Sequence, residues 1–463
     1  MRCSPVPTVA CLARSTARTA PSTSKAVNRS STPSPPATAP PAGGTFSPLR
    51  AAQRLDSHGY SPTLFRQIVE ASGSLKSFAQ AARAAHLFAG LDISGRHVGR
   101  LAHQIGAELA QRRDEDAVKH RQRQLPPRVV TAPALAVVEV DGGRLFTRAP
   151  GCGPGVHQAQ PKEDKVGCLL SMQNTPHEQD PQPEPPAAFR DARRVARLVQ
   201  RLHGGPPLPK AAQGEQPQEQ AGTAVAAEQA EAAEPWRGAP KRLVRTCVAT
   251  MQDSRSFGPM LAAEAQARNF YAAAKGAYLG DGQQYNWTIQ RGYFPNFKAI
   301  NDFIHVICYL YLAGWATGQD EEQRWQRYEG WMRACWQGRV DEVIQETACW
   351  QEQLGRPPPG EELDENDPRK VVAEALTYLR NNQGRMDYPS YRQEGLPVTS
   401  SLVESLVGEF NARVKGKDKH WNRPDGGEDI LQLRAAVLSQ DDRLRRFFAQ
   451  RPGCPYRRRP RPA

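Results

Sequence analysis

The feature that most constrains the fold is a change of hydrophobic periodicity near residue 134. Before residue 125, apolar residues recur at helical spacing, as in "LKSFAQAARAAHLFAG". From residue 134 onward, "ALAVVEVDGGRLFTR" predicts a strand, a tight Gly-Gly turn and a second strand, and "DKVGCLLSMQ" predicts a third. "KRLVRTCVATM" and "GAYLGD" are also typical of strands, with a helix expected in "SFGPMLAAEAQARNFYAAA" between them. Strands before and between helices indicate a mixed α/β domain.

The first 50 residues have a different composition. They contain no Asp or Glu, and 24 of the 50 are Pro, Ser or Thr. Such a segment buries too little apolar surface to offset its chain entropy, so we expect disorder over 1–50. An acid-free start with Arg and Ser also resembles an organellar transit peptide, but its prolines argue against the amphipathic helix that such a peptide forms.

Residues 51–125 are expected to form a helical DNA-binding region. In "LDISGRHVGRLAHQIGAELAQRR", Ser94 is placed to cap a second amphipathic helix after a Gly-containing turn. Helix, turn and second helix fit a helix-turn-helix, in which Arg96, His97 and Arg100 would face DNA. The alternative is an ordinary helical hairpin with solvated arginines.

The α/β domain is expected to be interrupted. Its first part would span 134–316, with a Pro-, Gln-, Ala- and Glu-rich loop at 204–235. Residues 317–395 predict an all-helical insertion with a small core of its own, because five residues lie along one helix face: Trp325, Tyr328, Met332, Cys335 and Trp336. The domain would resume over 396–450 and end in a basic tail, 451–463.

Net charge and cysteine spacing indicate the class of partner and the cellular compartment to expect. The formal charge is +13, from 61 Lys and Arg against 48 Asp and Glu, which favours a polyanionic partner such as nucleic acid. The nine cysteines include no C-x-x-C, so we expect neither a disulfide scaffold nor a Cys-based zinc site. Reduced cysteines of this kind are typical of a cytoplasmic protein, which is the compartment we expect. No segment approaches 18 consecutive apolar residues, so we expect no membrane span.

Three acids form a candidate metal site. Asp141 and Asp281 each end an apolar strand and precede a glycine, and Glu404 lies on the first turn of a helix. Carboxylates from separate elements can converge on two Mg²⁺ or Mn²⁺ ions, which serve phosphoryl transfer. Local alternatives exist for each acid. Either aspartate could belong to a surface hairpin turn, and Glu404 could complete a capping box with Ser401.

Several stretches together resemble one family. They are "VVEVDGGRLFTRAPGCGPGVH", "KEDKVGCLLSMQ", "AYLGDGQQYNW", "INDFIHVICYLYLA" and "YRQEGLPVTSSLVESLVGEFNARVKGKDKHWNRP". In this order they are similar to the Kra group of bacterial insertion-sequence transposases, which are DDE enzymes related to the mutator-like group. The resemblance implies a ribonuclease-H-like core with flanking helices and a helical insertion before the last acid. It also implies that Asp141, Asp281 and Glu404 bind the metal ions.

The resemblance extends to supporting residues. "DFIH", from Asp302 to His305, resembles a D-x-x-H signature, and its i, i+3 spacing puts both side chains on one helix face. His305 could then touch a phosphate or orient a carboxylate, or it could be a buried structural histidine. A basic, aromatic run after Glu404 is placed to hold DNA, although it could also be a solvated loop: Arg413, Lys415, Lys417, Lys419 and Trp421.

The function implied is that of a DNA transposase. It would cut at the ends of an insertion sequence and join the exposed 3′-hydroxyl to target DNA, acting as a dimer or larger assembly on DNA and associated with the nucleoid. The helix-turn-helix would recognise the terminal inverted repeats. The alternatives are a related nuclease without strand transfer and a DNA-binding relic without catalysis.

The N-terminus departs from the family pattern. Members usually carry Cys-pair zinc motifs before a segment like "GTFSPLRAAQRLDSHGYSP", present here at 44–62, but the cysteines are absent. We therefore expect no intact zinc site. Residues 1–43 are instead rich in Pro, Ala, Arg, Thr and Ser, which are the residues that GC-rich codons tend to give when they are translated out of frame. Our hypothesis is that residues 1 to about 43 arise from a frameshift.

Overall fold

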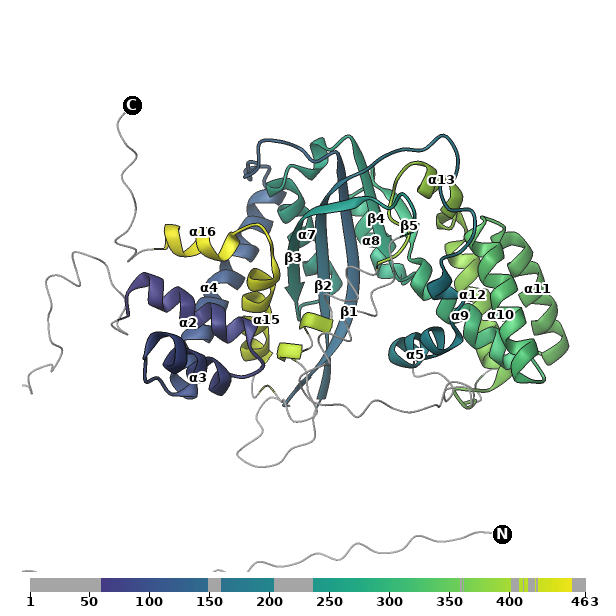
Figure 1. The fold of residues 1–463 in the computed structure, drawn as a ribbon, viewed down its shortest axis with the longest axis horizontal. Helices are drawn as coiled ribbons and strands as arrows, with labels where there is room; N and C mark the ends of the chain where they lie inside the picture. The colour runs from purple at the N-terminus through teal and green to yellow at the C-terminus, as the bar shows by residue number, and fades with distance from the viewer. Residues whose placement is uncertain are drawn as a thin grey trace, which may run out of the picture. The chain divides into compact units, whose positions relative to one another are not determined.

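A mixed five-stranded sheet is formed by the described residues of the computed structural model (Figure 1). The described residues are 60–148, 160–203, 236–358, 360, 362–400, 408–410, 412–414, 421 and 424–451. The strands are β1 (Leu135–Thr147), β2 (Gln160–Gln173), β3 (Lys241–Thr250), β4 (Lys275–Gly280) and β5 (Lys298–Asn301), in the order β3-β2-β1-β4-β5. The first three are antiparallel neighbours, whereas β4 and β5 run parallel to β1. The architecture is therefore mixed α/β, as the sequence predicts.

The Gly-Gly turn predicted after Asp141 is wrong. β1 continues through Gly142 and Gly143, which pair with Lys165 and Asp164 of β2 in an unbroken antiparallel ladder. The two strands expected over 134–148 are thus one long strand. Glycine tolerates an extended backbone as well as a turn, and at Gly143 a Cβ atom would lie 2.7 Å from the Asp164 carboxylate. The glycine serves close packing here, so Asp141 does not open a hairpin.

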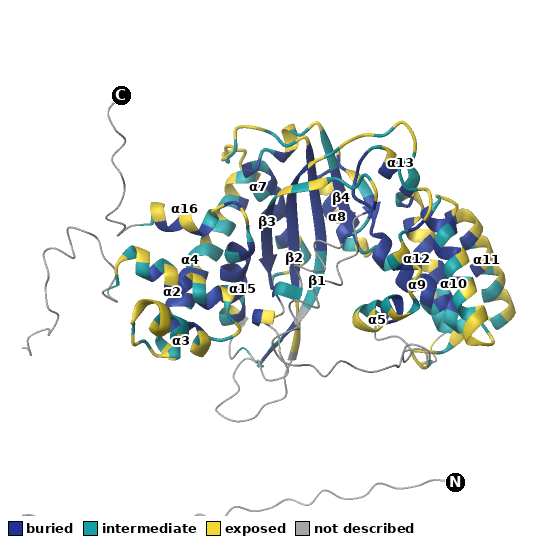
Figure 2. Ribbon diagram, viewed as in Figure 1, coloured by how far each residue is buried: buried dark blue, intermediate teal, exposed yellow. Residues whose placement is uncertain are grey.

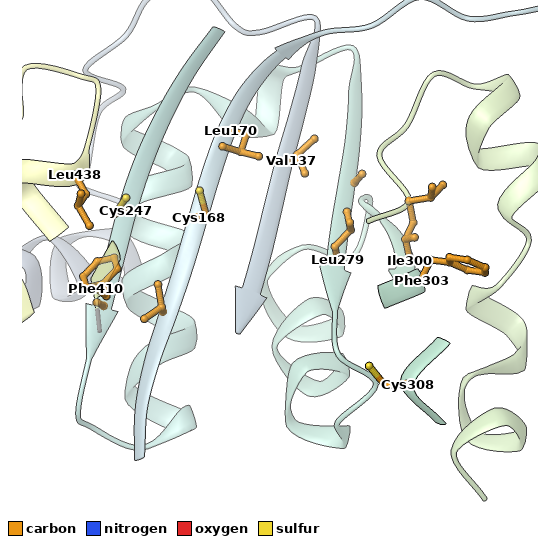
Figure 3. Close-up of a cluster of buried hydrophobic side chains, with 14 of the residues drawn as sticks. Val137, Cys168, Leu170, Cys247, Leu279, Ile300, Phe303, Cys308, Phe410 and Leu438 are labelled. Carbon is orange, nitrogen blue, oxygen red and sulfur yellow. The ribbon is translucent and has the colours of Figure 1, made fainter. Parts of the chain in front are cut away.

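Both faces of the sheet are covered, which explains why the central strands carry apolar residues on both sides. Val138 of β1 packs with Phe257 of α7 (Ser254–Ala267) and Trp287 of α8 (Gln284–Tyr293). On the opposite face, Val137 belongs to a second cluster with residues of α9 (Phe303–Thr317) and α15 (Pro424–Leu438). Figure 3 shows part of this second cluster, and Figure 2 shows the buried strands between the helices.

Three helices form where the sequence predicts them in the N-terminal region: α2 (Pro62–Ser74), α3 (Phe78–Ala89) and α4 (Gly95–Arg121). Ser94 caps α4, accepting a hydrogen bond from the His97 N–H at 3.2 Å. α3 ends at Gly90, whose left-handed backbone begins the turn into α4. α4 packs on α7 and α15 and so joins the helical region to the sheet.

The helical region after residue 317 does not have a separate core. It comprises α10 (Glu321–Trp336), α11 (Val340–Leu354), α12 (Pro368–Asn382), the 3-10 helix η4 (Gln383–Arg385) and α13 (Tyr388–Gln393). Tyr328, Met332 and Trp336 are buried in the same cluster as Val137 of the sheet. The cause is α9, which is apolar on almost every side and packs against both α10 and α12. The prediction of an independent core is therefore wrong.

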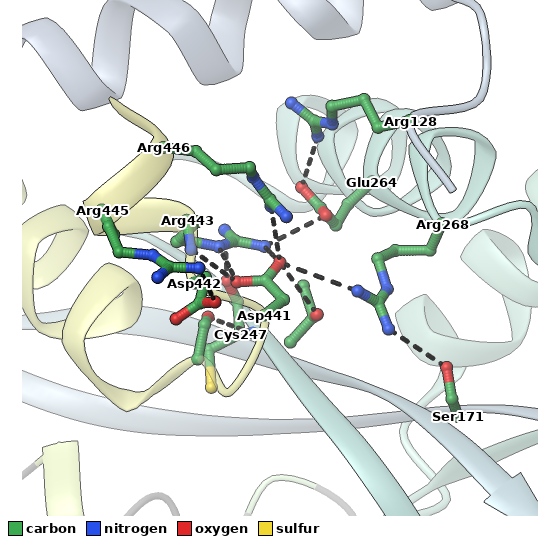
Figure 4. Close-up of polar contacts among 12 residues, drawn as sticks. Arg128, Ser171, Cys247, Glu264, Arg268, Asp441, Asp442, Arg443, Arg445 and Arg446 are labelled. Atoms are coloured by element: carbon green, nitrogen blue, oxygen red, sulfur yellow. Dashed lines mark hydrogen bonds and ion pairs between the residues drawn. The ribbon is translucent and has the colours of Figure 1, made fainter. Parts of the chain in front are cut away.

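The segment around Asp441 covers the outer edge of the sheet at β3. The Cys247 N–H donates to Ser439 Oγ at 2.9 Å, and the Arg245 guanidinium donates to the Leu438 carbonyl. Asp441, buried before α16 (Arg443–Gln450), pairs with Arg443, as Figure 4 shows. Exposed strand edges favour unwanted pairing between chains, and these contacts close this edge.

The remaining short elements are η1 (Ala187–Phe189), α5 (Ala192–His203) and η3 (Phe270–Ala272). No helix in the described part of the chain is both long enough and apolar enough to cross a bilayer. The predictions for 1–50, for the 204–235 loop and for the tail from 452 onward lie outside the described residues.

Candidate functional site

The structure brings Asp141 and Asp281 together where the parallel pairing between β1 and β4 ends. In the parallel ladder between β1 and β4, Glu139 pairs with Leu279. Asp141 and Asp281 each lie two residues further along, so they are neighbours just past the last pair of this ladder: Asp281 follows the end of β4, whereas Asp141 lies within β1, which continues beside β2. Both aspartates are half-buried. Two acids that are 140 positions apart in the sequence (281 minus 141) therefore share one site.

Asp281 lies in a turn between a strand and a helix. One carboxylate oxygen, Oδ1, accepts hydrogen bonds from the Gln283 N–H at 2.9 Å and from Asn286 Nδ2 at 2.8 Å. These contacts orient the side chain just before α8. The chain continues from β4 into α8, so the surface-hairpin alternative for "GDG" is wrong. Among the described residues, no hydrogen bond reaches the second oxygen, Oδ2.

Asp141 is held in a poorly solvated position. Burial raises the pKa of Asp141 to about 6. The neighbouring carboxylates of Asp281 and Asp302 contribute to this rise, against the opposing effects of His305 and of the Gly142 N–H, which donates to Asp141 Oδ1 at 2.7 Å. The carboxylates of Asp141, Asp281 and Asp302 thus lie close enough to interact, and a cation would be bound favourably among them.

Asp302 serves mainly as an anchor within this site. It follows β5 directly and caps α9, where its Oδ1 accepts from the Ile304 N–H at 3.1 Å. The same carboxylate accepts hydrogen bonds from the Ser400 N–H at 3.0 Å and from the Ser400 hydroxyl. Its side chain is 1% exposed. Asp302 therefore fixes the chain at residue 400, four positions before Glu404.

His305 lies against Asp302, as the shared helix face predicts. Its Nε2 atom is 3.8 Å from Asp302 Oδ2, and its side chain is 13% exposed. His305 also influences the Asp141 carboxylate electrostatically. The histidine is thus both mostly buried and beside the aspartate cluster, so the two alternatives for its role are compatible.

The donor set fits a divalent metal ion. Glu404, the third predicted ligand, lies outside the described residues, and those described contain no group of three or more His, Cys, Asp or Glu arranged to hold a metal. Asp141 and Asp281 alone supply two neighbouring carboxylates, one from within β1 and one from the end of β4. Hard oxygen donors of this kind are what Mg²⁺ and Mn²⁺ prefer.

Sequence reasoning missed some residues around this site. Glu139 is fully buried and lies on the same face of β1 as Asp141, which the alternation in "VEVD" could have indicated. His203, at the end of α5, has its ring 6.1 Å from that of His305, and burial lowers the pKa of His203 to about 4, as does His305. The apolar spacing in "ARRVARLVQRLH" is a helical signal for α5.

The predicted DNA-binding residues of the helical region lie on the first turns of α4. Arg96 and Arg100 are exposed and His97 is half-buried. An Arg100 guanidinium nitrogen is 3.1 Å from His97 Nδ1, and the His97 ring lies near that of Tyr60. The two arginines are thus available to a ligand at the N-terminal end of the second helix.

The basic run after Glu404 is only partly described. Arg413 is 3% exposed, donates to the Ser72 carbonyl at 2.8 Å and stacks on Phe78, so it packs inside the protein instead of lying on the surface as expected. Trp421 is half-buried, and its backbone donates to the Phe146 carbonyl and accepts from the Arg148 N–H at the end of β1. The predicted lysines lie outside the described residues: Lys415, Lys417 and Lys419.

Comparison with models of known protein families and with curated proteins found no match to this chain.

Proposed function

We propose that this chain is a DNA transposase that cleaves DNA at insertion-sequence ends and transfers the strand into target DNA with the aid of a divalent metal ion. The observation that carries the proposal is the meeting of Asp141 and Asp281 on adjacent parallel strands, just past the last pair of the ladder between β1 and β4. The family resemblance singles out these two acids, and they lie far apart in the sequence. These two aspartates would hold Mg²⁺ or Mn²⁺ for phosphoryl transfer.

The sheet supports the proposal at the level of architecture. Within the described residues, three antiparallel strands are extended by two parallel ones, with helices on both faces. We propose that this is the ribonuclease-H-like core that the resemblance implies. The helical region from α10 to α13 lies in sequence between Asp281 and Glu404, as expected for an insertion before the last acid.

Each residue of the proposed site would have its own role in the reaction. Asp141 and Asp281 would hold the metal, and Glu404 would complete its ligands. When bound, two such ions would polarise the phosphoryl oxygens and lower the pKa of the attacking water or hydroxyl. Asp302 positions α9 and the chain before Glu404 through its bonds to Ser400. His305 would place a proton or positive charge beside this cluster.

DNA recognition is proposed for the helical region. The exposed Arg96 and Arg100 at the start of α4 have the placement that a recognition helix requires. We propose that they contact terminal inverted repeats. Joining two DNA ends in one reaction would bring two or more copies of the chain together on DNA, in the cytoplasm at the nucleoid.

A strand-joining assay tests this function against its two alternatives. The purified protein would be mixed with end-labelled DNA that carries the inverted repeats flanking its gene, with an unlabelled target plasmid, in Mg²⁺ or in EDTA. Mg²⁺-dependent nicking followed by joining to the plasmid supports the transposase. Nicking without joining supports a nuclease, and binding alone supports a non-catalytic DNA-binding protein.

A further inference from the structure

The turn that carries Asp281 is held from outside the sheet by helix α12. The Tyr378 hydroxyl donates to the Asp281 carbonyl oxygen at 3.2 Å and accepts a hydrogen bond from Asn301 Nδ2 at 2.9 Å. Asn301 is the last residue of β5, directly before Asp302. One phenol therefore ties together the ends of β4 and β5, the strands that precede Asp281 and Asp302.

A second residue of α12, Asn382, forms a hydrogen bond with the next peptide group of the turn. Asn382 Nδ2 donates to the Gly282 carbonyl at 3.4 Å and to the Tyr378 carbonyl at 3.0 Å. Its Oδ1 accepts a hydrogen bond from Trp287 Nε1 of α8 at 2.8 Å. Asn382 is 1% exposed, so these bonds form away from solvent, where they are stronger than at a surface.

The glycine after Asp281 is required by this arrangement. Gly282 has φ +94, a conformation that residues with a side chain rarely adopt. A Cβ atom at this position would also collide with the Tyr378 ring and lie 2.8 Å from Asn382 Nδ2. The glycine thus lets α12 approach the turn closely enough to bond its backbone.

We propose that Tyr378 and Asn382 are positioning residues that hold Asp281 in the orientation needed to bind a divalent cation. The helical region after residue 317 is then part of the site, since α12 reaches the aspartate turn while it packs on α9. The ring of Tyr378 stacks on Tyr309 of α9 at 3.9 Å, which fixes the phenol. This inference rests on the proposed function, in which Asp281 is a metal ligand.

Calorimetric titration of the full-length chain with Mn²⁺ tests the proposal. Tyr378→Phe removes the hydroxyl, and Asn382→Ala removes the amide. Each change should weaken Mn²⁺ binding by about tenfold, as loss of a residue that orients a metal ligand typically does. Tyr328→Phe is the matched control, because it removes a buried hydroxyl that bonds the Phe189 carbonyl at 2.9 Å instead of the Asp281 turn.

Hydrogen exchange in EDTA gives a second measurement that needs no metal. Tyr378→Phe should speed amide exchange in residues 278–287, and Tyr328→Phe should leave exchange there unchanged. If Tyr378→Phe binds Mn²⁺ as tightly as the wild type and its amides in residues 278–287 exchange at the wild-type rate, the positioning role is overturned. If Asp281→Asn also leaves Mn²⁺ binding unchanged, the metal site of the proposed function is overturned as well, and the inference falls with it.

Discussion

The two aspartates were identifiable from sequence because each ends an apolar run. Adjacent parallel strands can bring acids that follow two apolar runs together. Asp141 and Asp281 do meet in this way, although β1 continues past Asp141. The glycines beside them were harder to interpret. Gly142 and Gly143 continue a strand, whereas Gly282 makes a turn with positive φ. The difference depends on neighbours such as Asp164 and Tyr378, which are distant in sequence.

The raised pKa of Asp141 predicts an unusual effect of pH on stability in EDTA. Its folded pKa, about 6, lies above the ordinary value of 3.8. The folded form therefore holds the proton more tightly, and stability is lost as pH rises through this window. Asp141→Asn removes that loss and should stabilise the metal-free protein by about 2–3 kcal/mol above pH 6. Urea unfolding at several pH values measures this. The gain should vanish near pH 4, and a constant gain would contradict the assignment.

Asp441 predicts the opposite dependence on pH. Burial alone would raise its pKa, but Arg443, with Arg446 and Arg268, holds the pKa of Asp441 at about 2. Its contribution is present above the unfolded value of 3.8 and is lost as pH falls through about 2.

Asp441→Asn should therefore destabilise the protein by about 2 kcal/mol at pH 7, and by less below pH 3.8. Urea unfolding at both pH values measures the change. Asp442→Asn is the control, because Asp442 is 63% exposed and its pair with Arg445 is a surface one. Equal losses in the two variants would contradict the role of the buried network.

Elements were predictable where a local pattern decides them. The capped helices of the N-terminal region and the alternating or apolar strands follow from short-range periodicity. The packing of α10 and α12 did not follow, because an aromatic stripe shows that a helix buries one face without showing against what. α9 supplies that partner, as its apolar surface extends almost all round.

The start of α4 carries the prediction for DNA recognition. If Arg96 and Arg100 contact base edges, Arg96→Ala or Arg100→Ala should each weaken binding to inverted-repeat DNA by about 1–3 kcal/mol, and binding to random DNA by less. Fluorescence anisotropy at fixed salt measures both affinities. Arg83→Ala, an exposed arginine on α3, is the control and should affect the two DNAs alike. An equal loss on both DNAs for the α4 variants would show that they contact only phosphates.

For the whole molecule, the mixed α/β class could be predicted, but the contacts that hold the site could not. Tyr378 and Asn382 bond the Asp281 turn from 97 and 100 positions further along the chain. Neither forms part of a pattern with spacing or composition of its own. Their placement depends on how α12 docks on α9, which only the folded chain reveals. The acids are thus visible in the sequence, whereas the residues that orient them are not.

The most direct test of the account is DNA cleavage by variants that remove one acid at a time. Asp141→Asn, Asp281→Asn and Glu404→Gln each remove a charge with little change of volume. Each should reduce Mg²⁺-dependent nicking of labelled inverted-repeat DNA by more than about 100-fold, because a metal ligand is lost. Each should bind that DNA as the wild type does. Asp364→Asn, an exposed acid in the loop before α12, should cleave normally. Wild-type cleavage by Asp141→Asn or Asp281→Asn would contradict the proposed site.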